Sequence, residues 1–246
     1  MVSKPKEINV LGINFTNINN KELISQLKID SHNHSNRFIV TANPEIVLYA
    51  RDNPKYLSII ESADYTIADG IGIIKGAKIL NTPLPERVTG FDTLLSLLTF
   101  ANENKKSIYF LGAKSETLDK AIKKIKNDYP NLEIAGYHDG YFTDDSDIVT
   151  EIKHNKPDFV FVALGFPKQE FFISKYHNLS PSIWMGVGGS FDVLAGTVKR
   201  APLFWQKHHI EWLFRLLQEP TRFFRMLALP KYLILIYLKK LGIDKK

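Results

Sequence analysis

The chain has 246 residues, of which 44% are hydrophobic and 24% are charged, so it has the composition of a globular protein with a sizeable core. It contains no cysteine, which excludes disulfides and thiolate metal sites. The net charge of +6 is uneven, because residues 1–195 carry 21 Lys/Arg and 23 Asp/Glu, whereas residues 196–246 carry eleven and three.

Residues 8–15 predict a short hairpin or edge strand at the amino end, with Gly12 at the turn. Further along, short apolar runs each lead into a turn and then into a helical pattern. These runs cover residues 38–41, 108–111, 159–164 and 183–185. Repeats of strand, turn and helix indicate an α/β fold with a mostly parallel sheet and flanking helices. Ligands bind such sheets at the carboxyl ends of the strands, so we expect the chemistry in these turns.

The turn after residues 38–41 places polar groups at the end of a predicted strand. There the Thr41 hydroxyl and the Asn43 amide could face a ligand. Asn43 could instead cap the next helix, with Pro44 in its first position, and capping alone would explain this asparagine. The residue types leave both interpretations open.

A further apolar run, residues 65–68, ends at Asp69 and Gly70. A carboxylate in this place is either a helix N-cap or a general base, and capping is the commoner role of an isolated Asp. Arg87 follows a proline-containing loop and offers a cation for an anionic ligand, or is merely a surface residue. Asp69 and Arg87 are therefore the candidates for a base and for an anion-binding group.

The last two predicted strands lead into turns with different polar groups. Gln169, just inside a helix, could hydrogen-bond a sugar or a base. Gly188 and Gly189 let backbone amides approach a phosphate at a helix start, and Asp192 could hold a ribose hydroxyl. This turn is neither a P-loop nor a dinucleotide fingerprint, because Phe191 stands where G-x-G-x-x-G needs its third glycine.

Asp145 and Asp147 form a D-x-D pair, which holds a divalent metal in many sugar-nucleotide enzymes. Here the pair opens a helical pattern, so we interpret it as acidic first-turn residues below a Thr143 cap. The seven histidines show no paired spacing typical of metal ligands on a helix. The sequence therefore predicts no metal site and no cofactor.

Residues 196–246 are predicted to form a basic, amphipathic helical appendage to an α/β core of residues 1–195, because the composition shifts most sharply near Gly196. Apolar residues at i, i+3, i+4 and i+7 indicate one amphipathic helix in it. These are Ile210, Leu213, Phe214 and Leu217. Pro220 and Pro230 are expected to divide the appendage into three short helices.

The appendage is also rich in aromatic residues. They are Phe204, Trp205, Trp212, Phe214, Phe223, Phe224, Tyr232 and Tyr237. Basic and aromatic residues together fit a bilayer, which Leu233 and Ile236 are expected to face. No run approaches the roughly 18 apolar residues of a membrane-spanning helix, and the N-terminus has no apolar stretch of signal-peptide length, so we expect peripheral membrane association. The alternative is a solvated helical tail docked on its own domain.

Six motifs, in this order, resemble one protein family. They are Thr41-Ala-Asn-Pro-Glu45, Ala68-Asp-Gly70, Glu86-Arg-Val-Thr-Gly90, Leu164-Gly-Phe-Pro-Lys-Gln-Glu170, Gly186-Val-Gly-Gly-Ser-Phe-Asp192 and Lys199-Arg-Ala-Pro202. Each motif alone is weak, but together they make the sequence similar to the WecG/TagA/CpsF glycosyltransferases of bacterial surface-polymer synthesis, over nearly its whole length. It resembles most closely the TagA-type N-acetylmannosaminyltransferases of wall teichoic acid synthesis.

The resemblance implies a Rossmann-like fold and an inverting, metal-independent transfer of N-acetylmannosamine from its UDP derivative. The implied acceptor is N-acetylglucosaminyl-diphospho-undecaprenol, at the cytoplasmic face of the cell membrane. The favoured general base of the family falls on Asp69. Its pocket residues fall on Thr41, Asn43, Arg87 and Gln169. Arginines of the appendage are thought to complete the site, and the candidates here are Arg215, Arg222 and Arg225.

Alternatives remain open at this point. A relative that uses another UDP sugar would carry similar motifs. A nucleotide-binding α/β regulator or oxidoreductase is disfavoured by the missing dinucleotide fingerprint. A nucleic-acid-binding protein could use the basic tail, but the slightly acidic body and the helical spacing of the aromatic residues argue against a nucleic-acid partner. Apolar faces in the tail could also pair subunits in a homo-oligomer.

Overall fold

A small hairpin precedes the main sheet. The computed structural model describes residues 6–220 and 223–243. In it, β1 (Glu7–Val10) pairs antiparallel with β2 (Ile13–Thr16). The two turn residues, Leu11 and Gly12, have φ angles of 51° and 93°, as a two-residue hairpin turn with positive φ requires. The predicted hairpin with Gly12 at its turn is confirmed.

Six parallel strands form the main sheet, in the order β4-β3-β8-β7-β5-β6. Their bounds are β3 (Arg37–Ala42), β4 (Tyr65–Ala68), β5 (Ser107–Gly112), β6 (Glu133–His138), β7 (Phe159–Ala163) and β8 (Ile183–Gly186). Each predicted apolar run coincides with one of these strands, with only residue 164 lying beyond the end of β7, so the predicted parallel α/β sheet is confirmed. β6 was not predicted, because this edge strand is exposed or half-buried and lacks the continuous apolar run of a central parallel strand.

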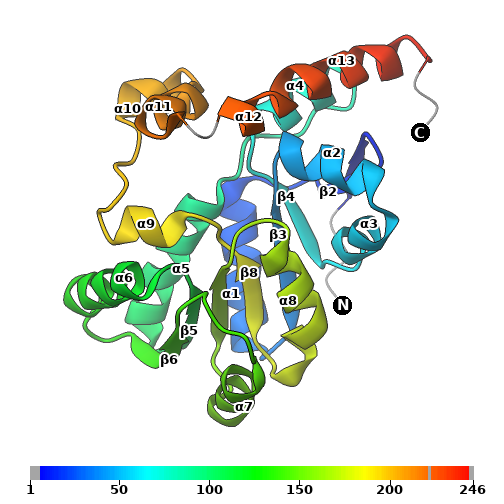
Figure 1. Ribbon diagram of the computed structural model, residues 1–246. Helices are drawn as coiled ribbons and strands as arrows, with labels where there is room; N and C mark the ends of the chain where they lie inside the picture. The colour runs from blue at the N-terminus through cyan, green and yellow to red at the C-terminus, as the bar shows by residue number, and fades with distance from the viewer. Residues whose placement is uncertain (1–5, 221–222, 244–246) are drawn as a thin grey trace.

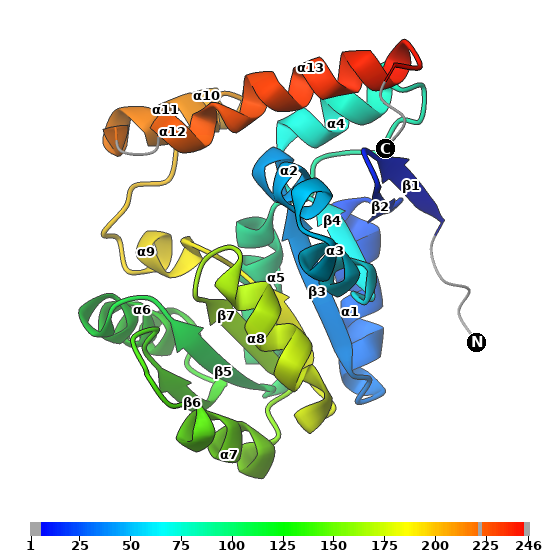
Figure 2. The ribbon, with the colours of Figure 1, turned by 45° about the vertical axis from the view of Figure 1, so that its right-hand side comes forward.

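Helices cover both faces of the sheet (Figures 1 and 2). One face carries α1 (Asn20–His32), α5 (Gly90–Asn104), α6 (Ser115–Asp128) and α9 (Ser190–Leu194). The other carries α2 (Pro44–Asp52), α3 (Pro54–Glu61), α7 (Ser146–Asn155) and α8 (Lys168–Tyr176), with α4 (Ile71–Ile79) beyond α2. Alternate residues of a strand point to opposite faces, so Phe38 and Val40 join one apolar cluster and Ile39 the other.

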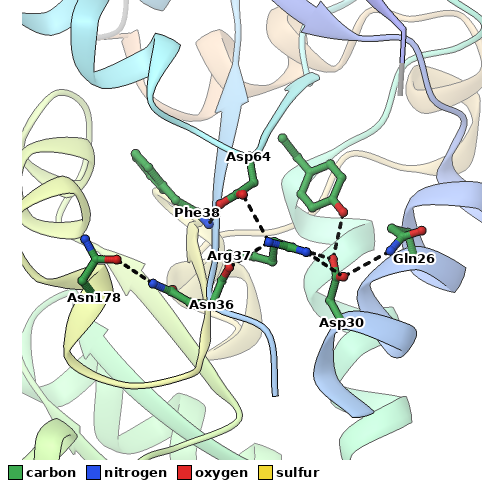
Figure 3. Close-up of polar contacts among 8 residues, drawn as sticks. Gln26, Asp30, Asn36, Arg37, Phe38, Asp64 and Asn178 are labelled. Carbon is green, nitrogen blue, oxygen red and sulfur yellow. Dashed lines mark hydrogen bonds and ion pairs between the residues drawn. The ribbon is translucent and has the colours of Figure 1, made fainter. Parts of the chain in front are cut away.

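A polar cluster links three elements at the amino ends of β3 and β4 (Figure 3). The Asp30 carboxylate of α1, only 2% exposed, accepts hydrogen bonds from Arg37 Nε at 3.1 Å and from the Tyr65 hydroxyl at 2.8 Å. Arg37 Nη1 also lies 3.4 Å from Asp64 Oδ1, and Asp64 Oδ2 accepts the Phe38 N–H at 2.8 Å. A buried carboxylate is tolerated when its oxygens have such partners. The cluster fastens α1 to β3 and β4 at this edge of the sheet.

The Asp145–Asp147 pair opens α7, as expected, but the predicted Thr143 cap is wrong. The carboxylate of Asp144 instead accepts the first N–H of the helix, at 3.0 Å. Asp145 accepts a hydrogen bond from the Tyr176 hydroxyl at 2.6 Å. Asp145 therefore fastens α7 to the end of α8.

Within the described part of the tail, four helices, not the predicted three, follow α9 and lie across the carboxyl edge of the sheet (Figures 1 and 2). They are α10 (Leu203–Lys207), α11 (Glu211–Gln218), α12 (Phe223–Met226) and α13 (Ala228–Lys240). Pro230 does not interrupt α13, because it is the third residue of this helix, where a backbone N–H has no partner within the helix. No helix among the described residues is both long and apolar enough to cross a bilayer.

α13 packs on the core through one of its sides. Tyr232 and Ile236 are fully buried there, in the apolar cluster that also contains Ile73 and Ala77 of α4. The expectation that Ile236 faces a bilayer is therefore wrong. Leu233 is 36% exposed and Ile234 59%, so the outward side of α13 is nevertheless apolar. The end of the chain completes the core and also presents an apolar surface.

Candidate active site

A cavity of about 350 Å³ lies at the carboxyl ends of the parallel strands, between the core and the tail helices. The turns after β3, β4, β7 and β8 form one wall, and α11 to α13 contribute the other. Most candidate residues line it, namely Thr41, Asn43, Asp69, Arg87, Gln169, Gly188, Gly189, Arg215 and Arg225. Asp192 is not among the lining residues, and Arg222 lies outside the residues that the structure describes.

Thr41 and Asn43 both serve the local structure while they line the cavity. The Thr41 hydroxyl, largely buried, donates to the Gly186 carbonyl oxygen at 3.1 Å and so ties β3 to β8. Asn43 Oδ1 accepts the Ile46 N–H at 3.0 Å and caps α2, with Pro44 in the first helical position. The capping interpretation of Asn43 is thus confirmed, and its position at the cavity wall is compatible with a second role.

Asp69 directly follows β4 and continues the sheet pairing, because its N–H donates to the Ala42 carbonyl oxygen at 3.0 Å. The alternative that Asp69 caps α4 is wrong, since Gly70 is the N-cap residue. Gly70 has to be small, because a Cβ atom there would lie 2.7 Å from Pro44 Cδ. The Asp69 carboxylate lines the cavity, and the nearby Gly90 backbone N–H acts to lower its pKa. Asp69 therefore lies at the cavity without serving as a helix cap.

The charges around Asp69 come from both parts of the chain. Burial raises the pKa of the Asp69 carboxyl, and Glu211 raises it further. Arg87 and Arg215 oppose this rise through their positive charges. The pKa of the Asp69 carboxyl is raised overall, so Asp69 is a stronger base than an ordinary aspartate.

Arg87 and Glu211 form a largely buried ion pair between the core and α11. Arg87 Nη2 donates to Glu211 Oε2, and the two side chains are 18% and 12% exposed. Arg87 Nε is buried without a hydrogen-bond partner among the described residues. Sequence analysis missed Glu211, which is one acidic residue in a basic segment, 124 positions from its partner.

Two further ion pairs bind tail residues to the core at the cavity. The Arg225 guanidinium donates to both carboxylate oxygens of Glu45, with distances of 2.9 to 3.2 Å. Arg200 of the Lys-Arg-Ala-Pro motif donates to Asp92 Oδ1 at 2.5 Å and lies 4.9 Å from the Phe91 ring centroid. Arg200 also lines the cavity, so it joins the basic groups that an anion could contact.

The glycine turn after β8 is hydrogen-bonded to the side chain of Gln169. Gly188, with φ of +50°, donates its N–H to Gln169 Oε1 at 3.0 Å. The Gly188 N–H is therefore already hydrogen-bonded within the protein. The Gly189 N–H is not part of this hydrogen bond. Asp192 shapes the loop that follows α9, because its carbonyl oxygen accepts the Val198 N–H at 3.1 Å.

One carboxylate of raised basicity thus shares a cavity with several guanidinium groups. A carboxylate of this kind can take a proton from a hydroxyl, and arginines can bind the two oxygens of a phosphate group together. The arrangement suits the transfer of a group between an alcohol and a phosphate-bearing donor.

Comparisons with known proteins agree with this chemistry. Residues 8–246 match the family model described as glycosyl transferase WecG/TagA/CpsF family. A relative from Bacillus spizizenii is 48% identical over 196 residues, which are 79% of this chain and 76% of that protein. One from Staphylococcus aureus is 37% identical over 246 residues, covering 99% and 97%. Both are named N-acetylglucosaminyldiphosphoundecaprenol N-acetyl-beta-D-mannosaminyltransferase.

The environment of Asp69 predicts a pH-dependent gain in stability for Asp69→Asn. A carboxyl whose pKa is raised on folding binds its proton more tightly in the folded state. Its contribution to the free energy of unfolding therefore falls as the pH rises above 3.8, the ordinary pKa of an aspartate in the unfolded chain. The variant should therefore melt higher than the wild type at pH 7 to 8, by about 2–4 °C per kcal/mol, and the difference should vanish as pH approaches 4. Thermal unfolding of both proteins between pH 4 and 8 measures this, and a lower melting temperature at pH 8 would contradict it.

Proposed function

Because the chain belongs to the WecG/TagA/CpsF family of glycosyl transferases, we propose that it transfers N-acetylmannosamine from UDP-N-acetylmannosamine to N-acetylglucosaminyl-diphospho-undecaprenol. This reaction adds one sugar to the linkage unit of wall teichoic acid. The names of the relatives support the transferred sugar and the acceptor. The observation that carries the proposal is the cavity that brings Asp69 together with Arg87 and Arg215.

Asp69 is the general base in the proposed mechanism. Its carboxylate takes the proton of the acceptor hydroxyl while that oxygen attacks the anomeric carbon of the donor. The bond between the anomeric carbon and the diphosphate oxygen breaks on the opposite face, so UDP leaves and the configuration inverts. The raised pKa of Asp69 suits this role, because a more basic carboxylate accepts the proton more readily.

The departing diphosphate gains negative charge, which the arginines of the cavity stabilise. Arg87, Arg200, Arg215 and Arg225 line the cavity, and Arg222 is a further candidate from the sequence alone. Guanidinium groups bind phosphate oxygens in pairs and can do the work of a metal ion here. Because Arg87 and Arg225 already hold carboxylates, the diphosphate competes with Glu211 and Glu45 for them.

The tail helices bind the inner face of the cell membrane in this proposal, where the polyprenyl acceptor is located. Large apolar side chains are exposed along α10 to α13, and they include Leu203, Phe204, Leu217, Phe223, Leu227, Ile234 and Tyr237. Lys207, Lys231 and Lys240 lie among them. A lipid surface fits this mixture better than a second copy of the chain, since basic residues are drawn to anionic lipids but would face one another in a symmetric dimer.

A donor panel tests the proposed function. The purified protein is incubated with a short-chain, water-soluble acceptor analogue and with the UDP derivatives of N-acetylmannosamine, N-acetylglucosamine, glucose and galactose in turn. We expect rapid UDP release with the first donor only, and only when the acceptor is present. Faster release with another donor would overturn the sugar assignment, and no release with any donor would overturn the transferase assignment.

The same panel, run with excess EDTA, tests the proposed independence from metal ions. We expect an unchanged rate. Loss of activity with EDTA that Mg²⁺ or Mn²⁺ restores would contradict the arginine mechanism and return attention to Asp145 and Asp147.

Asp69→Asn should lower turnover roughly 10²–10⁴-fold, which is the usual contribution of a general base. UDP affinity should stay within about 3-fold of the wild type, because Asp69 acts on the acceptor hydroxyl. Steady-state kinetics and calorimetry with UDP measure the two quantities. Asp144→Asn is the matched control, since it removes an exposed carboxylate from the start of α7 and should leave turnover unchanged. Near-normal turnover of Asp69→Asn would remove this residue from the mechanism.

Two substitutions in the tail should separate catalysis from membrane binding. Arg215→Ala should lower turnover roughly 10- to 100-fold on the soluble acceptor analogue, with no membrane present, because it removes a charge-assisted contact. Ile234→Ser should leave that rate unchanged but weaken binding to anionic vesicles about 10-fold, because Ile234 is an exposed apolar residue of α13.

Ile29→Ser, on an exposed residue of α1, is the control that should affect neither quantity. Full activity of Arg215→Ala on the soluble analogue would remove this arginine from the proposed mechanism. Point substitutions are preferable to truncation of the tail, because truncation would expose the core around Tyr232 and Ile236.

A further inference from the structure

A buried carboxyl lies directly behind the cavity wall. Glu170 is 1% exposed and follows Gln169, which is 3% exposed, in the first turn of α8. Gln169 Nε2 donates to Glu170 Oε1 at 2.8 Å. The proposed mechanism makes no use of Glu170.

The acceptor oxygens of Glu170 determine which way the Gln169 amide points. An amide has a donor end and an acceptor end of nearly the same shape, so its partners decide its orientation. An ionised carboxylate only accepts hydrogen bonds. It therefore holds Nε2 toward itself and turns Oε1 of the same amide toward the Gly188 N–H, which donates to it at 3.0 Å.

The Gln169 amide in turn fixes the glycine turn at the cavity wall. A Cβ atom on Gly186 would lie 2.6 Å from Gln169 Nε2, so the strand end and the amide are in tight contact. Gly188 and Gly189 line the cavity directly above. An inverted amide would direct an N–H group at the Gly188 N–H, and the turn would have to move.

Glu170 is costly as a purely structural residue. Its Oε2 atom has no hydrogen-bond partner among the described residues, and neither has the buried hydroxyl of Tyr56 in α3. Burial raises the pKa of Glu170 to about 7, and the groups that oppose this rise are the Gln169 amide, its own backbone N–H and the nearby Tyr56 hydroxyl. An apolar side chain of similar volume would avoid this desolvation.

We propose that Glu170 is a positioning residue, which orients the Gln169 amide so that the turn at Gly188 and Gly189 is held in the shape that receives the donor diphosphate. The inference rests on the proposed function for the identity of this ligand. The orientation itself rests only on the two hydrogen bonds and on the burial of both side chains.

Glu170→Met and Glu170→Gln test the proposal as a pair. Methionine keeps the volume but offers no oxygen, so UDP affinity should fall roughly 10-fold, in keeping with the loss of the hydrogen bond that orients the Gln169 amide. The Gly188 amide should exchange its hydrogen roughly 10-fold faster. Glutamine keeps an acceptor oxygen, so both quantities should stay within about 3-fold of the wild type. The melting temperature of Glu170→Met at pH 8 should equal or exceed that of the wild type, which a merely structural residue would not allow.

Tyr109→Phe is the matched control, because it removes a buried hydroxyl that donates to another carboxylate, Glu151, at 2.7 Å, away from the cavity lining, and should change neither UDP affinity nor Gly188 exchange. Unchanged Gly188 exchange in Glu170→Met would overturn the proposal, as would equal losses in all three variants. If Glu170→Met is too unstable to purify, a Glu170→Gln variant that loses UDP affinity 10-fold would overturn it as well. Two results together would support the positioning role and count against the proposed function. They are faster Gly188 exchange in Glu170→Met and no binding of UDP by the wild-type protein.

Discussion

One half-buried carboxylate, that of Asp69, connects the candidate site to charges from both the core and the tail. Asp69 loses water at the end of β4, and the positive charges of Arg87 and Arg215 recover only part of that loss, so its carboxyl remains unusually basic. One of these arginines belongs to the core and the other to α11. The electrostatic environment of the base is therefore complete only when the tail is docked on the core.

Docking of the tail depends on contacts of two kinds. Tyr232 and Ile236 of α13 enter the apolar core, whereas Glu211 and Arg225 form ion pairs with Arg87 and Glu45 at the cavity. Apolar burial is insensitive to the presence of an anion, but the ion pairs compete directly with one. α13 thus has the properties of a fixed attachment, whereas the ion pairs of α11 and α12 are contacts with which an anion in the cavity competes.

Much of the fold could be predicted because parallel strands are continuous apolar runs and their turns carry helix caps such as Asn43. β6 could not, since an edge strand exposed on one side lacks that signal. The turn residues of the candidate site were predicted to lie together because the carboxyl ends of parallel strands meet at one edge of the sheet, and they do line one cavity. Glu211 and Glu170 were not, because a single acidic residue has no periodicity, and its importance depends on partners that only folding brings near. Pro230 was misjudged because a proline breaks a helix only beyond its first turn.

Because of the polar cluster of Asp30, Arg37, Asp64 and Tyr65, substitutions at the amino ends and at the carboxyl ends of the strands are expected to have different consequences in evolution. The cluster secures β3 and β4 at the end of the sheet away from the cavity, so their register does not depend on the cavity residues alone. Turn positions at the opposite end that lack a structural role, unlike Thr41, Asn43 and Gly70, can then accumulate substitutions without loss of the fold. A lineage could in this way exchange one sugar for another while it inherits the same scaffold, and mutations in the cluster would reduce the amount of protein in the cell rather than alter its choice of substrate.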